Sequence, residues 1–487
     1  MKSLRAIALA PLLVLVACGG EAPPPAAPVH SSPTAKPVAS AAPATQDPLG
    51  ARPTPGMAPP FVPPTPIVFK ATNGITVWLV ERHTLPIVAV TVAIPAGSAA
   101  DPVDRGGVAF QTANMLDEGA GKYDALGLAR AVDGLGADLH TSANTDFSSA
   151  SLVLLKRNLA AGLPLLGDVV ARPKFAATEW ARQSTLWQND LKARASDPQA
   201  VAHVLFRTAV YGPGHPYGHP VDGTTTSAKK VGLADVKAYY AKEWRPDRAV
   251  VIVVGDTTKA ELEPMLDAAF GAWKAPKSAP PEPVKPLPRK PTGNRVYLVD
   301  RADAPQSVIA IANMTVDAAD PASPLLSRVN IAFGGSFTSR LNQDLREEHG
   351  WSYGAFSRAL RSRGPGELIA SSSVVTEKSA DALRAMIKDM KTFSTGGLTD
   401  DEVKKTQSQS RADLVGDYEQ VEKISALLSS DAAMGLPPDY QAKGSVARDQ
   451  MTKEQMNQIA KSFYDPSEGV VIAVGPKATL ITAIQGA

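Results

Sequence analysis

The chain has 487 residues, of which 44% are hydrophobic and 20% charged, and its formal net charge is +2 at pH 7. This composition is typical of globular proteins, and the length allows several domains. The near balance of charge excludes the broad basic surface of a nucleic-acid-binding protein, so no nucleic acid is expected as a partner. The single cysteine, Cys18, excludes a fold held by disulfide bonds, so stability must come from burial.

The first residues have the layout of a secretory signal peptide, with a basic start followed by an apolar run from Ala6 to Ala17. This run is too short to be kept as a membrane-spanning helix. Leu15-Val16-Ala17-Cys18 resembles a bacterial lipobox, in which the cysteine thiol receives a diacylglyceryl group and becomes the mature N-terminus. We therefore predict a lipoprotein signal peptide over residues 1–17 and lipidation at Cys18. The alternative is an ordinary signal peptide with a chance cysteine.

Two proline-rich segments divide the remaining chain. Residues 18–66 are mostly Pro, Ala, Ser and Thr, a composition that cannot bury enough apolar area to fold and predicts an extended tether. Residues 275–293, "APKSAPPEPVKPLPRKPTG", predict a linker. The predicted domains are therefore residues 67–274 and residues 294–487.

These two domains are expected to be copies of one unit. Residues 77–102 align without a gap on residues 296–321, and Asp101-Pro102 falls on Asp320-Pro321. Near the ends of the copies, "VVIVVG" at residues 250–255 matches "VVIAVG" at residues 470–475. Self-similarity at a spacing of about 220 residues indicates an internal duplication.

Periodicity predicts a mixture of strands and helices within each copy. The strongest patterns in the first copy are the strands Val77–Val80, Ile87–Ile94 and Val250–Val254 and the helices Asp124–Leu135, Thr178–Ala195 and Ala234–Trp244. Their arrangement predicts an α+β fold, in which helices pack on one face of a mainly antiparallel sheet.

Several local patterns together resemble a known family. The stretch Gly107–Leu116, "GVAFQTANML", is a helix start that follows the strand end "AGSAADP", and "HPYG" stands at residues 215–218. With the duplication, they resemble the M16 (pitrilysin-like) metallopeptidases, especially the two-domain bacterial and mitochondrial-processing subunits, over nearly all of residues 66–480. The resemblance implies a two-domain clamshell of the LuxS/MPP-like metallohydrolase type.

The resemblance also shows what this chain lacks. Active members carry the zinc motif His-x-x-Glu-His on the first long helix and a further zinc-binding Glu downstream. Here the three motif positions fall on Phe110, Ala113 and Asn114, so no imidazole and no general base is present. The downstream Glu falls on Asp190. It could be a residual ligand, but Asp190 matches Asp413 of the second copy, where the family holds no metal, so we interpret it as structural.

The stretch Gly334–Gly354, "GGSFTSRLNQDLREEHGWSYG", is the best local match in the second copy. It predicts a Gly-Gly turn, a helix with Phe337, Leu341 and Leu345 on one face, and a strand that begins in "GWSYG". In the family this stretch carries an Arg and a Tyr that project toward the substrate. Arg346 and Tyr353 have that spacing, and the resemblance implies that they bind a peptide carbonyl and stabilise developing oxyanion charge.

The leading hypothesis is a non-catalytic, substrate-binding subunit on the periplasmic side of a bacterial cell envelope. It would bind no cofactor itself and would pair with an M16 homologue that carries His-x-x-Glu-His and the zinc. The family resemblance implies peptide substrates that add as a strand to a sheet edge. Two alternatives stay open. One is a binding or scaffold lipoprotein with no role in proteolysis, and the other is a self-sufficient metallopeptidase with unconventional ligands, for which the sequence offers no histidine cluster.

Overall fold

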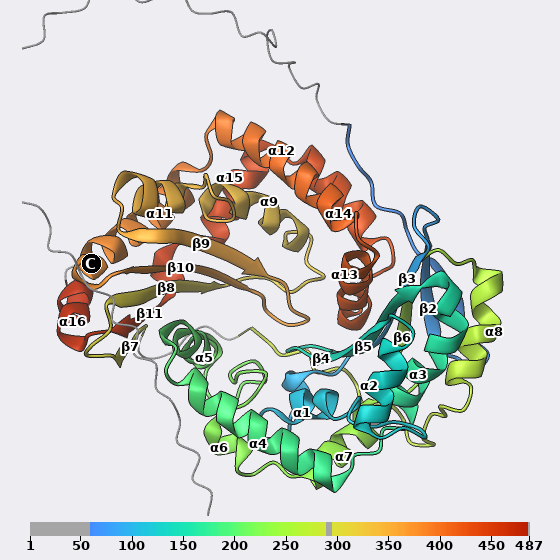
Figure 1. Cartoon of the computed structure of the whole chain (residues 1–487). Coiled ribbons are helices and arrows are strands. Elements are labelled where there is room, and N and C mark those ends of the chain that lie inside the picture. The colour runs from blue at the N-terminus through green and yellow to red at the C-terminus, as the bar shows by residue number, and fades with distance from the viewer. Residues whose placement is uncertain (1–58, 289–294, 486–487) are drawn as a thin grey trace, which may run out of the picture. The chain divides into compact units, whose positions relative to one another are not determined.

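The computed structural model describes residues 59–288 and 295–485 (Figure 1). The predicted signal peptide, Cys18 and the tether as far as residue 58 lie outside the described residues. Residues 59–66 have no regular secondary structure, and Phe61 packs edge-on against Tyr418 with ring centroids 5.5 Å apart. Within the described part of the chain, no helix combines the length and apolar character needed to span a bilayer.

The first half is built on a six-stranded sheet in the order β1-β2-β6-β3-β5-β4. Only β2 and β6 run parallel among these neighbours. The strands are β1 Ile67–Lys70, β2 Thr76–Glu81, β3 Ile87–Ile94, β4 Asp138–Ala143, β5 Ser148–Leu155 and β6 Val250–Gly255. The three strands predicted for this half are confirmed as β2, β3 and β6.

Helices of the first half cover one face of this sheet and form its main core with it. Their bounds are α1 Val108–Asn114, α2 Ala125–Asp133, α3 Leu159–Ala171, α4 Ala177–Arg194, α6 Thr225–Ala228, α7 Leu233–Glu243 and α8 Lys259–Phe270. The predicted helices are confirmed as α2, α4 and α7. Strand β3 is buried along almost its whole length rather than at alternate residues, which indicates that both faces of the sheet are buried.

The second half repeats this topology in a five-stranded sheet of order β7-β11-β8-β10-β9. Its strands are β7 Val296–Asp300, β8 Gln306–Met314, β9 Ser352–Leu360, β10 Glu367–Val375 and β11 Val470–Gly475. Its helices are α9 Ser323–Phe333, α10 Arg340–Asn342, α11 Ser379–Gly396, α12 Asp400–Asp417, α13 Val421–Met434, α14 Tyr440–Gln450, α15 Lys453–Phe463 and α16 Lys477–Gln485. Two sheets of matching strand order confirm the duplicated α+β fold.

Each half covers the second face of the other half's sheet with one of its own helices (Figure 1). Helix α5, Pro198–Tyr211, comes from the first half and packs Phe206 and Val210 against β8 and β11. Helix α13 of the second half packs Ile424 and Leu428 against β3 and β6. Each large apolar side chain buried in this way stabilises the pairing by about 1.5–3 kcal/mol. Neither sheet is therefore complete without the opposite half.

A buried polar junction joins the two halves. It lies where the loop between β4 and β5 meets the loop between β9 and β10. The Tyr217 hydroxyl donates to Asp146 Oδ1 at 2.5 Å and accepts from the Gly364 backbone N–H at 2.8 Å. The Arg363 backbone N–H donates to Asp146 Oδ2, and the Arg363 guanidinium donates to the carbonyl oxygens of Asp146 and Ala433. The "HPYG" loop is therefore a packed structural element, with Tyr217 only 1% exposed.

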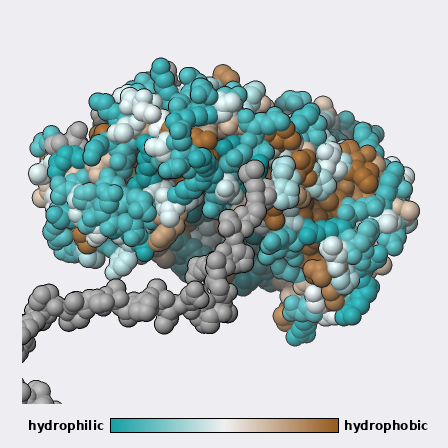
Figure 2. All heavy atoms as spheres, turned by 90° about the horizontal axis from the view of Figure 1, so that it is seen from above, coloured by the Kyte–Doolittle hydropathy of each residue, from teal (hydrophilic) through white to brown (hydrophobic). Residues whose placement is uncertain are grey.

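The surface seen from above is largely hydrophilic, and apolar residues emerge in separate patches (Figure 2). The large apolar side chains that are exposed among the described residues include Tyr353, Phe356 and Leu360 of strand β9.

Candidate functional site

Helix α1 keeps the position in which the family resemblance places the zinc motif. Gly107 begins it with a φ of 100°, and a Cβ at this position would lie 2.6 Å from the Trp187 ring. The Asp101 carboxylate accepts hydrogen bonds from the backbone N–H groups of Gly107 and Ala109 at 2.7 and 2.8 Å. Five of its residues are buried in the core. The helix is therefore kept as part of the fold, whatever chemistry it carries.

Substitution at Gly107 tests this structural role. We expect Gly107→Ala to lower the free energy of unfolding by about 2 kcal/mol or more, because alanine is strained at positive φ and its Cβ would clash with Trp187. The matched control is Gly416→Ala in α12, where the added Cβ meets nothing within 4 Å and the higher helix propensity of alanine should stabilise by up to about 1 kcal/mol. Urea unfolding followed by circular dichroism measures both. Equal effects at the two glycines would contradict the prediction.

The residues at the motif positions do not fit a zinc ion. Phe110 is half-buried against the core, Ala113 is fully buried and neither offers a donor atom. Asn114 offers a neutral amide in place of an imidazole. Asp190 lies on α4 as an exposed residue, and one carboxylate does not hold zinc alone.

Arg346 lies in a π-helical turn, Gln343–Glu348, that continues α10. The buried side chains of Leu341 and Leu345 fix this segment on the core, as predicted. Phe337 was predicted on the same helix face, and that prediction is wrong: it precedes α10 and is 57% exposed. Its ring instead stacks beneath Arg346, whose guanidinium carbon lies 4.2 Å from the ring centroid. This cation–π contact restricts the orientation of the guanidinium.

Tyr353 lies at the start of β9 and is 91% exposed. It forms part of the wall of a groove of about 800 Å³. Arg346 is not among the residues that line this groove. The structure thus places the two predicted residues on adjacent segments, with Tyr353 over the groove and Arg346 over Phe337.

The groove lies between helix α5 of the first half and strands β8, β9 and β10 of the second. It forms because α5 covers only part of this sheet face. Phe356, Leu360 and Ile369 give it an apolar floor, while Arg358 and His203 add polar groups. His203 and the neighbouring residues of α5 were not predicted from the sequence. Nothing in the local sequence of α5 shows that this helix lies against the opposite sheet. Two signals could have indicated it: the duplication, and a strand in the first half whose residues are almost all apolar, which implies a sheet covered on both faces.

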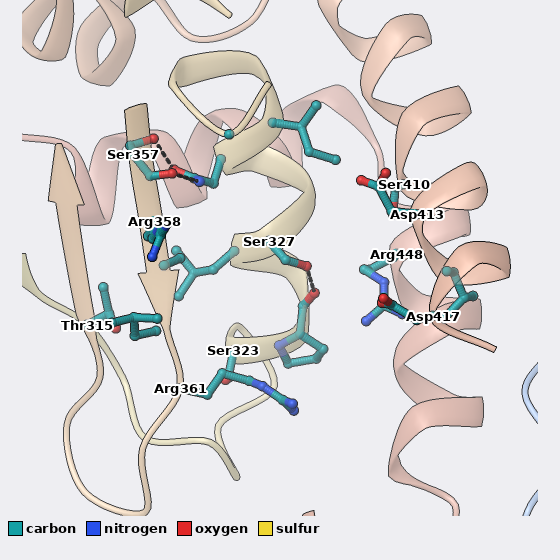
Figure 3. A pocket seen from close by; sticks show the side chains of 18 of the residues that line it. Thr315, Ser323, Ser327, Ser357, Arg358, Arg361, Ser410, Asp413, Asp417 and Arg448 are labelled. Atoms are coloured by element: carbon teal, nitrogen blue, oxygen red, sulfur yellow. Dashed lines mark hydrogen bonds between the residues drawn. The ribbon is translucent and has the colours of Figure 1, made fainter. Parts of the chain in front are cut away.

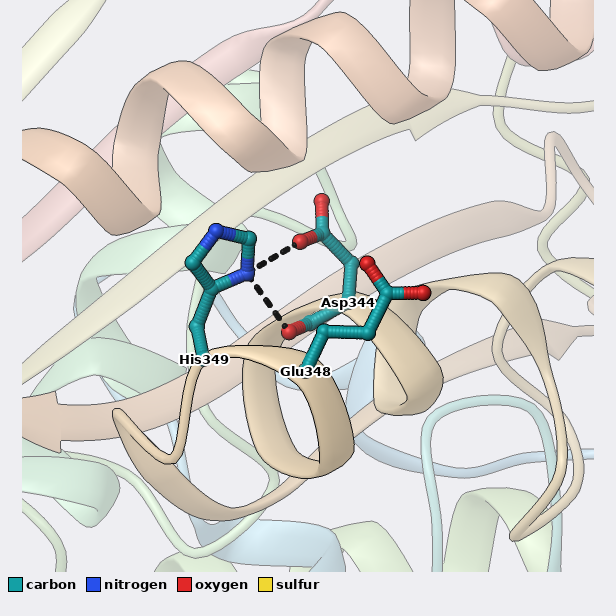
Figure 4. Close-up of side chains that lie close together, drawn as sticks. All are labelled: Asp344, Glu348 and His349. Atoms are coloured by element: carbon teal, nitrogen blue, oxygen red, sulfur yellow. Dashed lines mark hydrogen bonds and ion pairs between the residues drawn. The ribbon is translucent and has the colours of Figure 1, made fainter.

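Asp344, Glu348 and His349 are the group among the described residues whose possible metal-ligand atoms all lie within 4.8 Å of one another (Figure 4). His349 Nδ1 lies 2.7 Å from Asp344 Oδ1 and 3.0 Å from the Asp344 carbonyl oxygen. These contacts tie the end of the π-helical turn to its beginning. We therefore interpret this group as one that stabilises the end of the turn that carries Arg346.

Beneath this turn, burial and the neighbouring Asp344 raise the pKa of Asp389 to about 7. Because the folded-state pKa lies above the unfolded value of 3.8, the folded state holds a proton that the unfolded state releases between about pH 4 and 7. The contribution of Asp389 to stability is therefore present at low pH and is lost as the pH rises through this window.

We expect Asp389→Asn to become more stable relative to the wild type as the pH rises from 4.5 to 7.5, by up to about 1.4 kcal/mol per pH unit. The measurement is the urea midpoint of both proteins at several pH values. Asp381→Asn, an exposed aspartate on the same helix α11, is the control and should follow the wild type. Parallel stability profiles for the wild type and Asp389→Asn would contradict the prediction.

The sequence matches two descriptions of the same family. Residues 76–222 match "Insulinase (Peptidase family M16)" and residues 230–410 match "Peptidase M16 inactive domain". Together the two matches cover more than half of the chain.

Individual relatives give the same picture. The chain is 24% identical over 405 residues to an uncharacterized zinc protease of Mycobacterium bovis. The alignment covers 82% of this chain and 90% of that protein. It is also 24% identical over 334 residues to the non-peptidase homolog YmxG of Helicobacter pylori. That alignment covers 66% of this chain and 74% of that protein. The crystal structure of a peptidase M16 inactive domain from Pseudomonas fluorescens superposes with a TM-score of 0.77 at 25% identity, covering 85% of this chain and 98% of that one.

Proposed function

Because this chain belongs to the M16 family of peptidases, we propose that it is the non-catalytic, substrate-binding subunit of a heteromeric zinc peptidase. One observation carries the proposal. The motif positions Phe110, Ala113 and Asn114 provide no zinc ligand, whereas Arg346 and Tyr353 keep the frame of the family's substrate-binding pair. A chain of this kind needs a homologue that carries His-x-x-Glu-His.

The local geometry suits Arg346 for binding a peptide carbonyl. A guanidinium is planar, always charged and offers several donors in a fixed orientation. Stacking on Phe337 limits its motion, so less conformational entropy is lost when substrate binds. Glu347, at 3.5 Å from Arg346 Nε, leaves the guanidinium available because its side chain is 43% exposed and the interaction is solvated.

Tyr353 can supply a second donor to the same substrate. Its phenol is almost fully exposed and stands over a groove large enough for several residues of an extended peptide. Strand β9 is the edge of its sheet, so its unpaired backbone groups could take an added strand. The residues of this chain would thus bind and orient the substrate, while bond cleavage takes place at the partner.

We further propose that Cys18 carries a lipid and that residues 18–66 tether the folded part on the periplasmic side of the cell envelope. The basis is the lipobox-like sequence before Cys18 and the proline-rich composition that follows it. Metabolic labelling with an alkyne fatty acid tests this proposal, with Cys18→Ser as the control. Label that persists in Cys18→Ser would contradict it.

The direct test of the subunit proposal is a pull-down of the tagged full chain from solubilised native membranes. We expect a zinc-containing M16 homologue in the captured sample and hydrolysis of a quenched fluorescent peptide library by that sample. The chain purified alone should contain no stoichiometric zinc and should show no hydrolysis. Stoichiometric zinc and activity in the isolated chain would instead establish a self-sufficient enzyme. No partner and no activity in either sample would establish a scaffold lipoprotein.

A further inference from the structure

A second recess, in the second half, plays no part in the proposed function. It has a volume of about 440 Å³, which lies within the range of small-molecule sites. Its walls come from α9, β9, α12 and α14, with Leu427 added from α13. The elements α9, β9 and α12 are the counterparts in the duplication of α1, β4 and α4. The recess therefore lies among the elements that, in the first half, carry the degenerate motif positions.

Both signs of charge face this recess (Figure 3). Arg448 projects from α14 beside Asp417 of α12, Asp413 stands next to Ser410, and Arg361 points into the same space from the opposite wall. Arg361 is already ion-paired with Asp431 at 3.3 Å. Within residues 59–288 and 295–485, no hydrogen bond or ion pair of 4 Å or less joins the guanidinium of Arg448 or the carboxylate of Asp417 to another protein group. Arg448 is half-buried and Asp417 is exposed, so both charges are open to a ligand that enters the recess.

The pKa shifts of Arg448 and Asp417 show how their surroundings act on their charges. Burial, and then the nearby charge of Arg361, lower the pKa of the Arg448 guanidinium. Burial raises the pKa of the Asp417 carboxyl and Asp413 adds to this rise, while Lys423 and Arg448 oppose it without cancelling it. Each charged form is thus disfavoured by its surroundings and would be stabilised by an opposite charge from a ligand. A bare anion would meet the two aspartates, and a bare cation would meet the two arginines.

We propose that this recess binds a small zwitterion, a free amino acid or dipeptide with an apolar side chain, whose carboxylate faces Arg448 and whose ammonium faces Asp413 and Asp417. The guanidinium matches a carboxylate in shape as well as charge. Leu326, Leu414 and Leu427 provide apolar surface for the side chain. The site is independent of the Arg346 and Tyr353 pair, so the inference does not rest on the proposed peptidase role.

The experiment uses the full chain, isothermal titration calorimetry and thermal unfolding with three probes. These are L-alanyl-L-leucine, its N-acetyl derivative and its C-terminal amide. We expect the unmodified dipeptide to bind and to raise Tm by about 1–2 °C at ten times its Kd. Each blocked probe should bind at least about 10-fold more weakly, because removing one charge from the probe removes its charge-assisted hydrogen bonds to Arg448 or to the two aspartates.

Variants locate the site. Arg448→Gln should weaken binding of the unmodified dipeptide at least about 10-fold, and Asp417→Asn should abolish the preference over the N-acetyl derivative. Arg384→Gln, which changes an exposed arginine on α11, should bind the dipeptide as the wild type does. Each variant must show the circular dichroism spectrum of the wild type. Undetectable binding at 20 mM, equal affinity for the acetylated dipeptide, or unchanged binding by Arg448→Gln would each overturn the proposal.

Discussion

Arg346→Ala is expected to lower the kcat of the captured complex about 100-fold to 1000-fold while the zinc-bearing partner is still retained. Such a loss is typical when one donor to a developing oxyanion is removed. Tyr353→Phe should cause a smaller loss, on the order of 10-fold, because it removes a neutral donor and keeps the ring. Initial rates on a quenched fluorescent peptide, normalised to the zinc content of the complex, measure both effects.

The control is Arg384→Ala on α11, which removes an exposed arginine that is paired with Asp381. It should leave kcat and partner capture unchanged. Phe337→Leu should give an intermediate loss, because Arg346 remains but its stacking partner is gone. A loss of activity in Arg346→Ala that is explained entirely by loss of the partner would show that Arg346 acts in assembly. Unchanged activity in a complex that contains the partner would contradict the substrate-binding role.

Tyr217→Phe is expected to lower the free energy of unfolding by about 2–4 kcal/mol, because it removes one hydroxyl that serves both halves. Asp146 would lose a 2.5 Å hydrogen bond, and the Gly364 N–H would lose its acceptor. A buried polar group left without a partner costs about 1–3 kcal/mol. Burial holds the pKa of Tyr217 above its ordinary value, so the hydroxyl keeps its proton across the usable pH range.

Tyr353→Phe provides the matched control for stability, since the same atom is removed from a residue that is 91% exposed. Its urea midpoint should equal that of the wild type. Limited proteolysis adds a local measurement: Tyr217→Phe should expose cleavage sites in the linker around residues 275–288, because Arg363 donates to the Val284 carbonyl from the same junction. Equal midpoints for the two variants would show that the Tyr217 junction does not contribute to stability.

The sequence alone was sufficient for many of the helices and strands, and it led to the expectation that this chain binds no zinc. Runs rich in β-branched residues, such as Ile87–Ile94 and "VVIVVG", form strands at their predicted positions, because the residues of a strand themselves show its periodicity and its burial. The duplication required only that residues 77–102 and 296–321 be compared. The expectation that Phe110, Ala113 and Asn114 do not bind zinc rests on the chemistry of their side chains and needs no coordinates.

The position of Phe337 could not be predicted from the local sequence. A helical spacing from Leu341 and Leu345 predicts burial for Phe337, yet the helix begins only at Arg340 and the ring serves Arg346 instead. Helix starts depend on capping and on neighbouring segments as well as on apolar spacing, so their positions are less well determined by pattern.

By itself, the sequence determined the α+β fold and its duplication, and it led to the predictions that helix α1 holds no zinc and that Arg346 and Tyr353 bind substrate. The tertiary structure decided how these parts combine: α5 and α13 are exchanged between the sheets, Tyr217 joins the halves, and charged groups from α12 and α14 meet in one recess. The physical reason is that periodicity shows that a face is buried, whereas the partner of that face is chosen by packing among residues far apart in the chain.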